Sequence, residues 1–323
     1  MKIIVTGSSG FVGLNLTKKL KELGHFVIGI DRINVKNNSL NEFFQYDLSE
    51  LNLGKINKFS DVDLLIHCAA AKGDYKLNFD NFYKDNVEAT KKLVDFIEKF
   101  NINNVIHYST VSVYGHDNTQ FDEEADLNPD NSYGKTKLES EKILTNWRNI
   151  NAINRNLTIL RPSVIYGENN FANMYNLLTY LNREYVVFIG DGSHIKSMIA
   201  VENMVEITLF VLKNKGFQIY NSTDKPYYSL EQVTNIISEI DGFNKPIINI
   251  PLWISYIIAI PFEILSKILN KDLKLSFNRI YKFSKDTDYR SKKLDMNGYE
   301  QLFSTKERLQ NMARWYLKNK KNG

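Results

Sequence analysis

The first two-thirds of the chain alternate short apolar runs with longer segments whose apolar residues recur at helical spacing. Short apolar runs between turn residues are typical of buried strands, and apolar positions three to four residues apart are typical of amphipathic helices. Their alternation predicts βαβ units, and therefore a parallel sheet covered by helices. The predicted strands are Lys2–Thr6, Phe26–Ile30, Phe43–Tyr46, Leu64–His67, Val105–Ser109 and Leu157–Leu160, and the predicted helices are Val12–Leu23, Asn81–Phe100 and Tyr133–Asn149.

Beyond about residue 168 the pattern changes, because short strand-like and helix-like pieces mix and glycine turns recur, as at Gly190-Asp191-Gly192. We therefore predict an α/β fold in two parts. Residues 1–167 form a Rossmann-like, doubly wound parallel sheet that binds the cofactor and carries the catalytic residues. Residues 168–323 form a smaller, mixed α/β subdomain that binds the substrate. The chain is expected to cross this boundary more than once.

The segment Ile250–Leu269 is almost continuously apolar. Pro251 and Pro261 interrupt it, as do Glu263 and Lys267, so it is a poor candidate for a membrane span and no transmembrane segment is predicted. Two interpretations remain. The segment forms one or two buried helices of the C-terminal subdomain, or it forms a surface that rests against a membrane or a partner enzyme.

Composition narrows the possible partners and the compartment. The 323 residues include 41 Lys and Arg against 37 Asp and Glu, a near balance that gives no reason to expect a nucleic-acid partner. Cys68 is the only cysteine, so no intrachain disulfide can form, and its apolar neighbours indicate a core residue. The N-terminus lacks the long apolar stretch of a signal peptide, so a cytoplasmic protein is expected.

A glycine-rich turn follows the first predicted strand and leads directly into a helix. Gly7, Gly10 and Gly13 allow a tight turn and let the backbone approach a pyrophosphate, which would lie at the helix N-terminus. Asp31 ends the second strand, where a carboxylate accepts hydrogen bonds from the adenosine ribose and repels a 2′-phosphate. NAD is therefore predicted rather than NADP, although the adjacent Arg32 weakens that preference.

Two further strand ends fit a dinucleotide. Asp47 and Leu48 follow the third strand and are predicted to meet the adenine ring, although Asp47 also fits a helix N-cap. Small residues follow the fourth strand, where the cofactor must pass close to the backbone. They are Cys68, Ala69, Ala70 and Ala71.

Tyr133 and Lys137 lie one turn apart on one face of a predicted helix. A free phenol has a pKa near 10, and a nearby ammonium together with a nicotinamide cation should lower that pKa. The phenol could then exchange a proton with a sugar hydroxyl while hydride moves to or from the nicotinamide. Thr110, at the end of the fifth strand, is predicted to hold the same sugar oxygen. No metal site is predicted.

Together these motifs resemble the extended short-chain dehydrogenases, the NAD-dependent epimerase/dehydratase family, over essentially the whole chain. The resemblance is carried by TGSSGFVG (6–13), Asp31, Asp47-Leu48, HCAAA (67–71), Asn86, STVSVYG (109–115), YGKTK (133–137) and RPSVIYG (161–167). It implies a nucleotide-linked sugar as substrate and a homodimer formed through the helices of residues 81–100 and 133–149. It also implies further cofactor contacts from Phe11, Val12, Asn86, Ser109, Pro162, Ser163 and Val164.

The same resemblance implies the substrate contacts. Val111 and Ser112 stand where dehydratases of the family carry acidic residues, which disfavours elimination of water. Lys196 lies in a stretch that resembles the family segment closing over the nucleotide sugar, where a lysine could hold a diphosphate. The predicted substrate contacts are Lys72, Val111, Ser112, Arg161 and Lys196.

The predicted activity is C4 epimerisation of a nucleotide-linked sugar by transient hydride transfer to NAD, through a 4-keto intermediate. The alternative is an NAD(P)-dependent 4-keto-sugar reductase or dehydrogenase of deoxysugar or surface polysaccharide synthesis, a class that also contains the RPSVIYG form. A third hypothesis, a non-catalytic NAD-binding regulatory protein, is disfavoured because Tyr133 and Lys137 are both retained.

Overall fold

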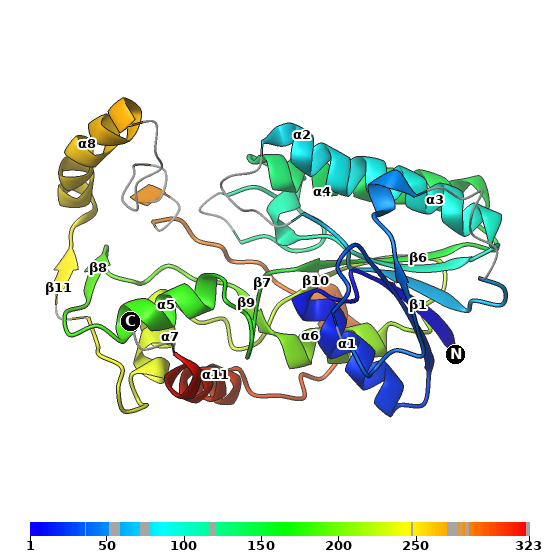
Figure 1. Cartoon of the computed structure of the whole chain (residues 1–323). Helices are drawn as coiled ribbons and strands as arrows, with labels where there is room; N and C mark the ends of the chain where they lie inside the picture. The colour runs from blue at the N-terminus through cyan, green and yellow to red at the C-terminus, as the bar shows by residue number, and fades with distance from the viewer. Residues whose placement is uncertain are drawn as a thin grey trace.

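The computed structural model describes residues 1–35, 37–51, 59–71, 78–116, 120–246, 248–269, 277, 280–281 and 284–320 (Figure 1). Its centre is a parallel sheet of seven strands in the order β10-β6-β5-β4-β1-β2-β3. This arrangement confirms the predicted α/β, Rossmann-like fold. The strands are β1 (Lys2–Thr6), β2 (Phe26–Asp31), β3 (Glu42–Gln45), β4 (Leu64–His67), β5 (Asn104–Tyr108), β6 (Asn156–Pro162) and β10 (Phe217–Ser222).

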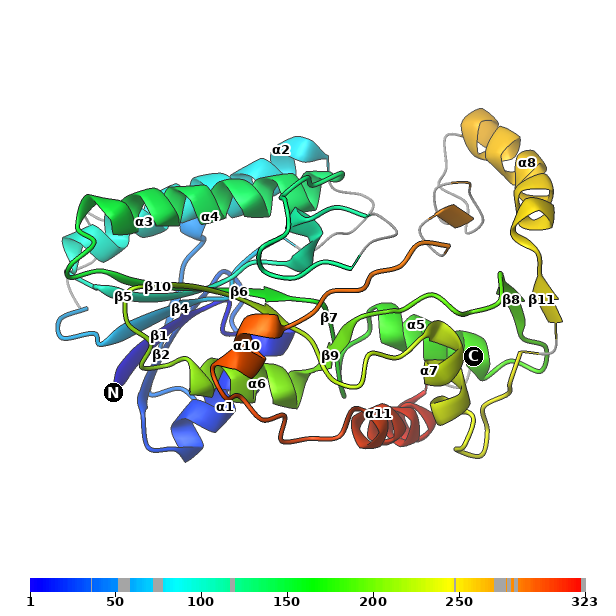
Figure 2. The ribbon, with the colours of Figure 1, turned by 180° about the vertical axis from the view of Figure 1, so that it is seen from behind.

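Helices cover both faces of the sheet, which is why its central strands β1, β4 and β5 are almost entirely buried (Figures 1 and 2). On one face, α1 (Phe11–Glu22) and α6 (Val201–Phe210) pack against side chains such as Val5 and Ile66. On the other, the layer of α3 (Ala89–Lys99) and α4 (Ser132–Ile150) packs against Ile4 and Leu65. A short helix α2 (Phe79–Phe82) and a π-helical turn η3 (Tyr83–Glu88) precede α3.

The strand order reverses between β1 and β4, which lie side by side with Thr6 opposite His67. Parallel strands all end at the same edge, so the turns that follow β1, β2 and β4 converge there. The fold therefore brings together the segments that the sequence marks as the cofactor site. The limits of each predicted strand and helix lie within two residues of those in the structure, except that the predicted helix Asn81–Phe100 is divided into α2, η3 and α3.

The seventh strand, β10, was not predicted. Its sequence FQIYNS has no continuous apolar run, and its first three residues are only half-buried. Backbone pairing with β6, Phe217 opposite Leu157, fixes it at the sheet edge. Both β10 and α6 therefore return to the sheet from beyond residue 167, while the division of the chain at that residue stays a prediction.

The C-terminal half has a core of its own, made by α5 (Asn173–Leu181), α7 (Leu230–Ile237) and α11 (Thr305–Asn319). Two small parallel sheets accompany these helices. The first pairs β7 (Val164–Tyr166) with β9 (Met198–Ala200), and the second pairs β8 (Val187–Ile189) with β11 (Ile248–Ile250). The short helix α10 (Lys292–Met296) leads back alongside β10.

The apolar segment Ile250–Leu269 forms one helix, α8 (Leu252–Leu269), at the far end of the C-terminal half (Figure 1). The expectation that it is buried is wrong, because most of its large apolar side chains are exposed, Trp253 by 66% and Ile257 by 56%. The segment lies outside the main cores because it packs through small and polar side chains, Ser255 and Ala259 among them. Within the described residues, no helix combines the length and the apolar character that a membrane crossing requires.

Candidate active site

The turn after β1 depends on its glycines. Gly7 has a φ of +71°, and a Cβ added there would lie 2.6 Å from the backbone nitrogen of Ala69. A Cβ on Gly13 would lie 2.1 Å from the carbonyl oxygen of Gly7. The first glycine therefore lets the turn approach the segment after β4, and the other lets α1 start close beneath the turn.

The N-terminus of α1 is suited to an anion. Its N-cap is Gly10, which offers no side-chain acceptor, and the first turn contains no acidic residue. The amides of that turn carry the partial positive charge of the helix end. The predicted pyrophosphate of a dinucleotide fits this position, because phosphate oxygens can accept from these amides.

Asp31 is held at the end of β2 by two backbone amides. Its carboxylate accepts from the amide of Ser9 at 3.0 Å and from the amide of Ile33 at 3.0 Å, which places it beside the glycine turn. The neighbouring Arg32 forms ion pairs with two carboxylates, since one guanidinium nitrogen lies 2.9 Å from Asp85 and 3.8 Å from Asp47. These ion pairs engage the guanidinium of Arg32, which could otherwise have met a 2′-phosphate.

Asp47 acts as a helix N-cap, the alternative that the sequence left open. It is the N-cap of a short 3₁₀ helix, η1 (Leu48–Glu50), and accepts from the amide of Ser49 at 2.9 Å. Leu48 packs into the core beneath the sheet and is almost fully buried. Adenine contact by these two residues stays a prediction.

Asn86 ties the segment after β4 to the catalytic helix. It lies in the π-helical turn η3, is buried, and accepts from the amide of Ala71 at 2.9 Å. Its own amide group donates to Thr136 at 3.0 Å.

Burial raises the pKa of the Cys68 thiol, which agrees with a core cysteine rather than a nucleophile.

Tyr133 and Thr110 are brought together as the sequence suggested. Asn131 caps α4 by accepting from the amide of Gly134 at 2.8 Å, and this cap sets Tyr133 in the first turn of the helix. The side chains of Tyr133 and Thr110 share a hydrogen bond. The Thr110 hydroxyl also accepts from the amide of Ser112 at 3.1 Å, where it caps η4 (Val111–Val113).

Burial sets the pKa of the Tyr133 phenol in the protein itself, and its lowering by Lys137 together with a nicotinamide cation stays a prediction. Burial raises the pKa of Tyr133 to about 12, and the Thr110 hydrogen bond offsets this only in part. Desolvation of the phenolate is thus the larger of the two effects. The nicotinamide cation, which the prediction counted as well, is not a group of the protein.

Lys137 lies against two histidines, of which the sequence analysis missed His107. Its Nζ is 3.4 Å from Nε2 of His107, whose ring stacks on that of His67 at a centroid distance of 5.1 Å. Burial, and then the charge of Lys137, lower the pKa of His67 to about 3 and hold the pKa of His107 well below its usual range. Both rings are therefore neutral, and burial lowers the pKa of Lys137 to about 8.

Arg161, predicted to meet the substrate, lies in a buried ion pair. Its guanidinium donates to both carboxylate oxygens of Glu141, at 3.0 and 2.7 Å, and to the Tyr114 hydroxyl at 2.8 Å. Ser109 donates its hydroxyl to the same carboxylate. Ser109 and Arg161 thus join β5 and β6 to α4, and a contact with cofactor or substrate would have to use other atoms or a rearranged pair.

The other predicted contacts near these strands differ in exposure. Val111 is buried with Tyr114 and Tyr289, whereas Ser112 is half-buried. The Ser163 amide donates to the Ser222 carbonyl at 3.0 Å, so Pro162 and Ser163 are fixed against β10. Val164, at the start of β7, is 41% exposed. Their roles stay predictions.

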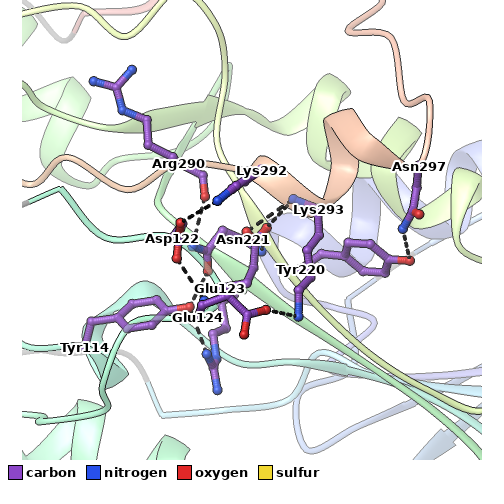
Figure 3. Close-up of polar contacts among 11 residues, drawn as sticks. Tyr114, Asp122, Glu123, Glu124, Tyr220, Asn221, Arg290, Lys292, Lys293 and Asn297 are labelled. Atoms are coloured by element: carbon purple, nitrogen blue, oxygen red, sulfur yellow. Dashed lines mark hydrogen bonds and ion pairs between the residues drawn. The ribbon is translucent and has the colours of Figure 1, made fainter.

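A polar network continues from Arg161 into the C-terminal half of the chain (Figure 3). The Tyr114 hydroxyl donates to Asn221 of β10 at 2.8 Å, and the Asn221 side chain donates to the Arg290 carbonyl at 3.0 Å. The amide of Asn221 donates to Glu123 at 3.0 Å, and Glu123 also accepts from the amide of Lys293. Asn221 therefore links the catalytic half to the segment that returns from α8.

Lys196 lies between two backbone segments of the C-terminal half. Its amide donates to the Tyr228 carbonyl at 3.1 Å, and its side chain donates to the Lys285 carbonyl. Burial lowers the pKa of Lys196 to about 8. Lys72, the remaining predicted substrate contact, lies outside the described residues.

Comparison with known proteins agrees with this geometry. Residues 3–222 match the model of the NAD dependent epimerase/dehydratase family. The chain is 30% identical over 305 residues to the N-acetyl-alpha-D-glucosaminyl-diphospho-ditrans,octacis-undecaprenol 4-epimerase of Escherichia coli O157:H7, covering 92% of this chain and 89% of that protein. It is 28% identical to a putative UDP-glucose 4-epimerase of Methanocaldococcus jannaschii, covering 75% and 83%.

Solved structures share the fold at lower identity. A UDP-glucuronic acid 4-epimerase from Bacillus cereus, in complex with UDP-glucuronic acid and NAD, superposes with a TM-score of 0.74. The two chains are 20% identical, and the match covers 98% of this chain and 99% of that one.

Replacing Arg161 with methionine should destabilise the protein by about 3 to 5 kcal/mol, because the Glu141 carboxylate would stay buried without its partner. Urea unfolding of the variant measures this loss. The double variant Arg161→Met/Glu141→Leu should regain most of it, since it removes both charges. A double variant as unstable as the single one would show that the buried charge is not the cause.

Lys137→Met should remove this lysine's share of a rise of stability with pH, while Lys196 keeps its own share. The unfolded chain keeps the lysine proton up to a pKa of about 10.4, whereas the folded protein releases it near pH 8. Between these values the unfolded state binds more protons, so the free energy of unfolding should rise by up to about 1.4 kcal/mol per pH unit. Urea unfolding of both proteins at pH 7, 8, 9 and 10 gives the two slopes, and equal slopes would contradict the buried ammonium.

Proposed function

The chain belongs to the NAD dependent epimerase/dehydratase family, and on that premise we propose that it is an NAD-dependent C4 epimerase of a sugar carried on a diphosphate. One observation carries this proposal. The hydroxyl groups of Tyr133 and Thr110 share a hydrogen bond, and Lys137 is buried one helical turn further along the same helix. This pair of hydroxyls is suited to holding a single carbinol oxygen and moving its proton.

The residues present fit NAD. The glycine turn and the N-terminus of α1 would hold its pyrophosphate, and Asp31 would accept from its adenosine ribose. NAD supplies a carbon centre that takes up a hydride and returns it. The ion pairs of Arg32 with Asp85 and Asp47 favour NAD over NADP, because they engage that cation.

Within this site Tyr133 acts as the base and then as the acid. It takes the proton of the C4 hydroxyl as that carbon is oxidised, and returns a proton when the 4-keto sugar is reduced from its other face. Thr110 holds the same oxygen in line. The positive charges of Lys137 and of the oxidised cofactor oppose the burial that raises the phenol pKa, so we infer that cofactor binding prepares Tyr133 for proton transfer.

The shared chemical group of the relatives' substrates supports a sugar diphosphate. The Escherichia coli relative acts, by its name, on a sugar joined through a diphosphate to undecaprenol, whereas other relatives are named for UDP-sugars. Lys196 is our candidate for that diphosphate. Burial destabilises its ammonium, so an anion beside it would be favoured.

The second candidate is a 4-keto-sugar reductase that uses the same residues once, with net redox change. The valine at position 164 favours it, because many 4-epimerases of this family carry an asparagine there. A non-catalytic, NAD-binding regulatory protein is disfavoured by the intact Thr110, Tyr133 and Lys137.

Tyr133→Phe should reduce turnover by at least about a hundredfold, because the residue supplies the acid and base of the reaction. The wild-type protein, given N-acetylglucosamine or glucose carried on UDP or on a prenyl diphosphate and no added cofactor, should interconvert the C4 epimers without net NADH. The variant should still bind NAD, measured by calorimetry. Turnover that requires added NAD(P)H and a 4-keto sugar would instead establish the reductase.

We also propose a cytoplasmic homodimer formed through α3 and α4, by analogy with the family. Light scattering at micromolar concentration should give about twice the 37.5 kDa mass of one chain. The mass of a single chain under the same conditions would contradict it.

A further inference from the structure

The helix α8 is amphipathic in the opposite sense to a helix that faces water. Ser255 and Ala259, one turn apart, are 3% and 0% exposed and form its inner face. Glu263 continues this face and is only half-buried. The outer side carries large apolar groups, which a water-facing helix would turn inward. These exposed side chains are Trp253, Ile257, Ile258, Ile260, Phe262, Ile264, Leu265 and Leu269.

The position of α8 separates it from the cores of the protein but not from the site. It projects from the far end of the C-terminal half, on the same side of the molecule as the α3–α4 layer (Figures 1 and 2). Before it, β11 pairs with β8, which leads into the turn at residues 190–192. After it, Thr287 and Ile195 bond through their backbones. The strand before α8, and Thr287 further along the chain, thus contact segments that flank Lys196.

Charge selects the kind of surface that would cover α8. Residues 264–285 of the sequence contain six Lys or Arg and one acid, Asp272. A second copy of this chain would bring an equally basic segment against the first, which disfavours self-association through α8. An anionic bilayer suits both the exposed apolar side of α8 and the basic residues that follow it, because it has an apolar interior beneath negatively charged headgroups.

We propose that α8 lies in the headgroup–acyl boundary of an anionic membrane, and that the enzyme takes its sugar from a polyprenyl diphosphate held in that membrane. The second half of this statement rests on the proposed function. Pro261 and Glu263 suit a helix that lies on the membrane rather than one that crosses it. The lipid chain leaves the diphosphate near Lys196 and follows α8 into the bilayer.

Vesicle flotation tests membrane binding without any sugar. Wild-type protein should float with vesicles of phosphatidylethanolamine and phosphatidylglycerol, and much less with phosphatidylcholine vesicles. Ile257→Asn/Ile264→Asn should reduce the bound fraction at least tenfold. The matched control is Ile153→Asn/Leu302→Asn, because these side chains are 94% and 65% exposed and lie outside α3, α4 and α8, and it should bind as wild type does. Circular dichroism and thermal unfolding confirm that each variant is folded.

Three results would overturn membrane docking. The first is no flotation of the wild-type protein, and the second is an equal loss of flotation in the α8 variant and the control variant. The third is a smaller oligomer on light scattering for the α8 variant alone, which would show that α8 contacts a second copy of the chain.

Activity tests the lipid-linked substrate separately. Wild-type protein should epimerise N-acetylglucosamine carried on a long polyprenyl diphosphate in anionic vesicles, and the α8 variant should lose most of this turnover. Both should act equally on a water-soluble analogue with a short prenyl chain. Turnover of UDP-sugar alone would overturn the lipid-linked substrate and leave the epimerase standing. Flotation without turnover of any sugar diphosphate would contradict the proposed function while membrane docking stands.

Discussion

The candidate site depends on an ammonium group kept out of water. Lys137 is buried on α4 against the neutral ring of His107, and burial lowers its pKa to about 8. Glu141 lies one turn further along the helix, but its carboxylate oxygens are engaged by Arg161. That carboxylate therefore offsets the lysine's desolvation only in part. A charge so weakly compensated interacts strongly with any polar group brought beside it, since little water is left to screen it.

The fold could be predicted from the sequence where burial alone decides the pattern. Strands β1 and β4 are buried along almost their whole length because helices cover both faces, and their limits were predicted to the residue. The edge strand β10 was not predicted, because its position is fixed by partners far away in the sequence. These partners are the backbone of β6 and the side chain of Glu123. Long-range contacts of this kind leave little mark on a local apolar pattern.

The candidate site was foreseen less evenly. Tyr133 and Thr110 were paired from their motifs, and the structure joins them. The burial that raises the pKa of Tyr133 could not be predicted, because spacing along a helix reveals a neighbouring charge but not the desolvation of the phenol itself. His107 and Glu141 were missed, since a histidine inside a strand and an acid inside a helix look ordinary in sequence. The sequence left burial and exposure of α8 both open, because apolar composition does not say which face packs.

Asn86 shows how narrowly one position can be constrained by two neighbours of opposite polarity. Its side-chain oxygen accepts a hydrogen bond from the amide of Ala71, and its side-chain nitrogen donates one to Thr136. One planar group therefore joins the segment after β4 to α4, the helix that carries Tyr133. Aspartate has the same shape but no proton to give, and leucine has the volume but neither function. Glutamine would keep both functions and misplace them by one methylene. Among the common side chains only an amide of this length suits the position, so small movements of the loop and of α4 are tied to each other.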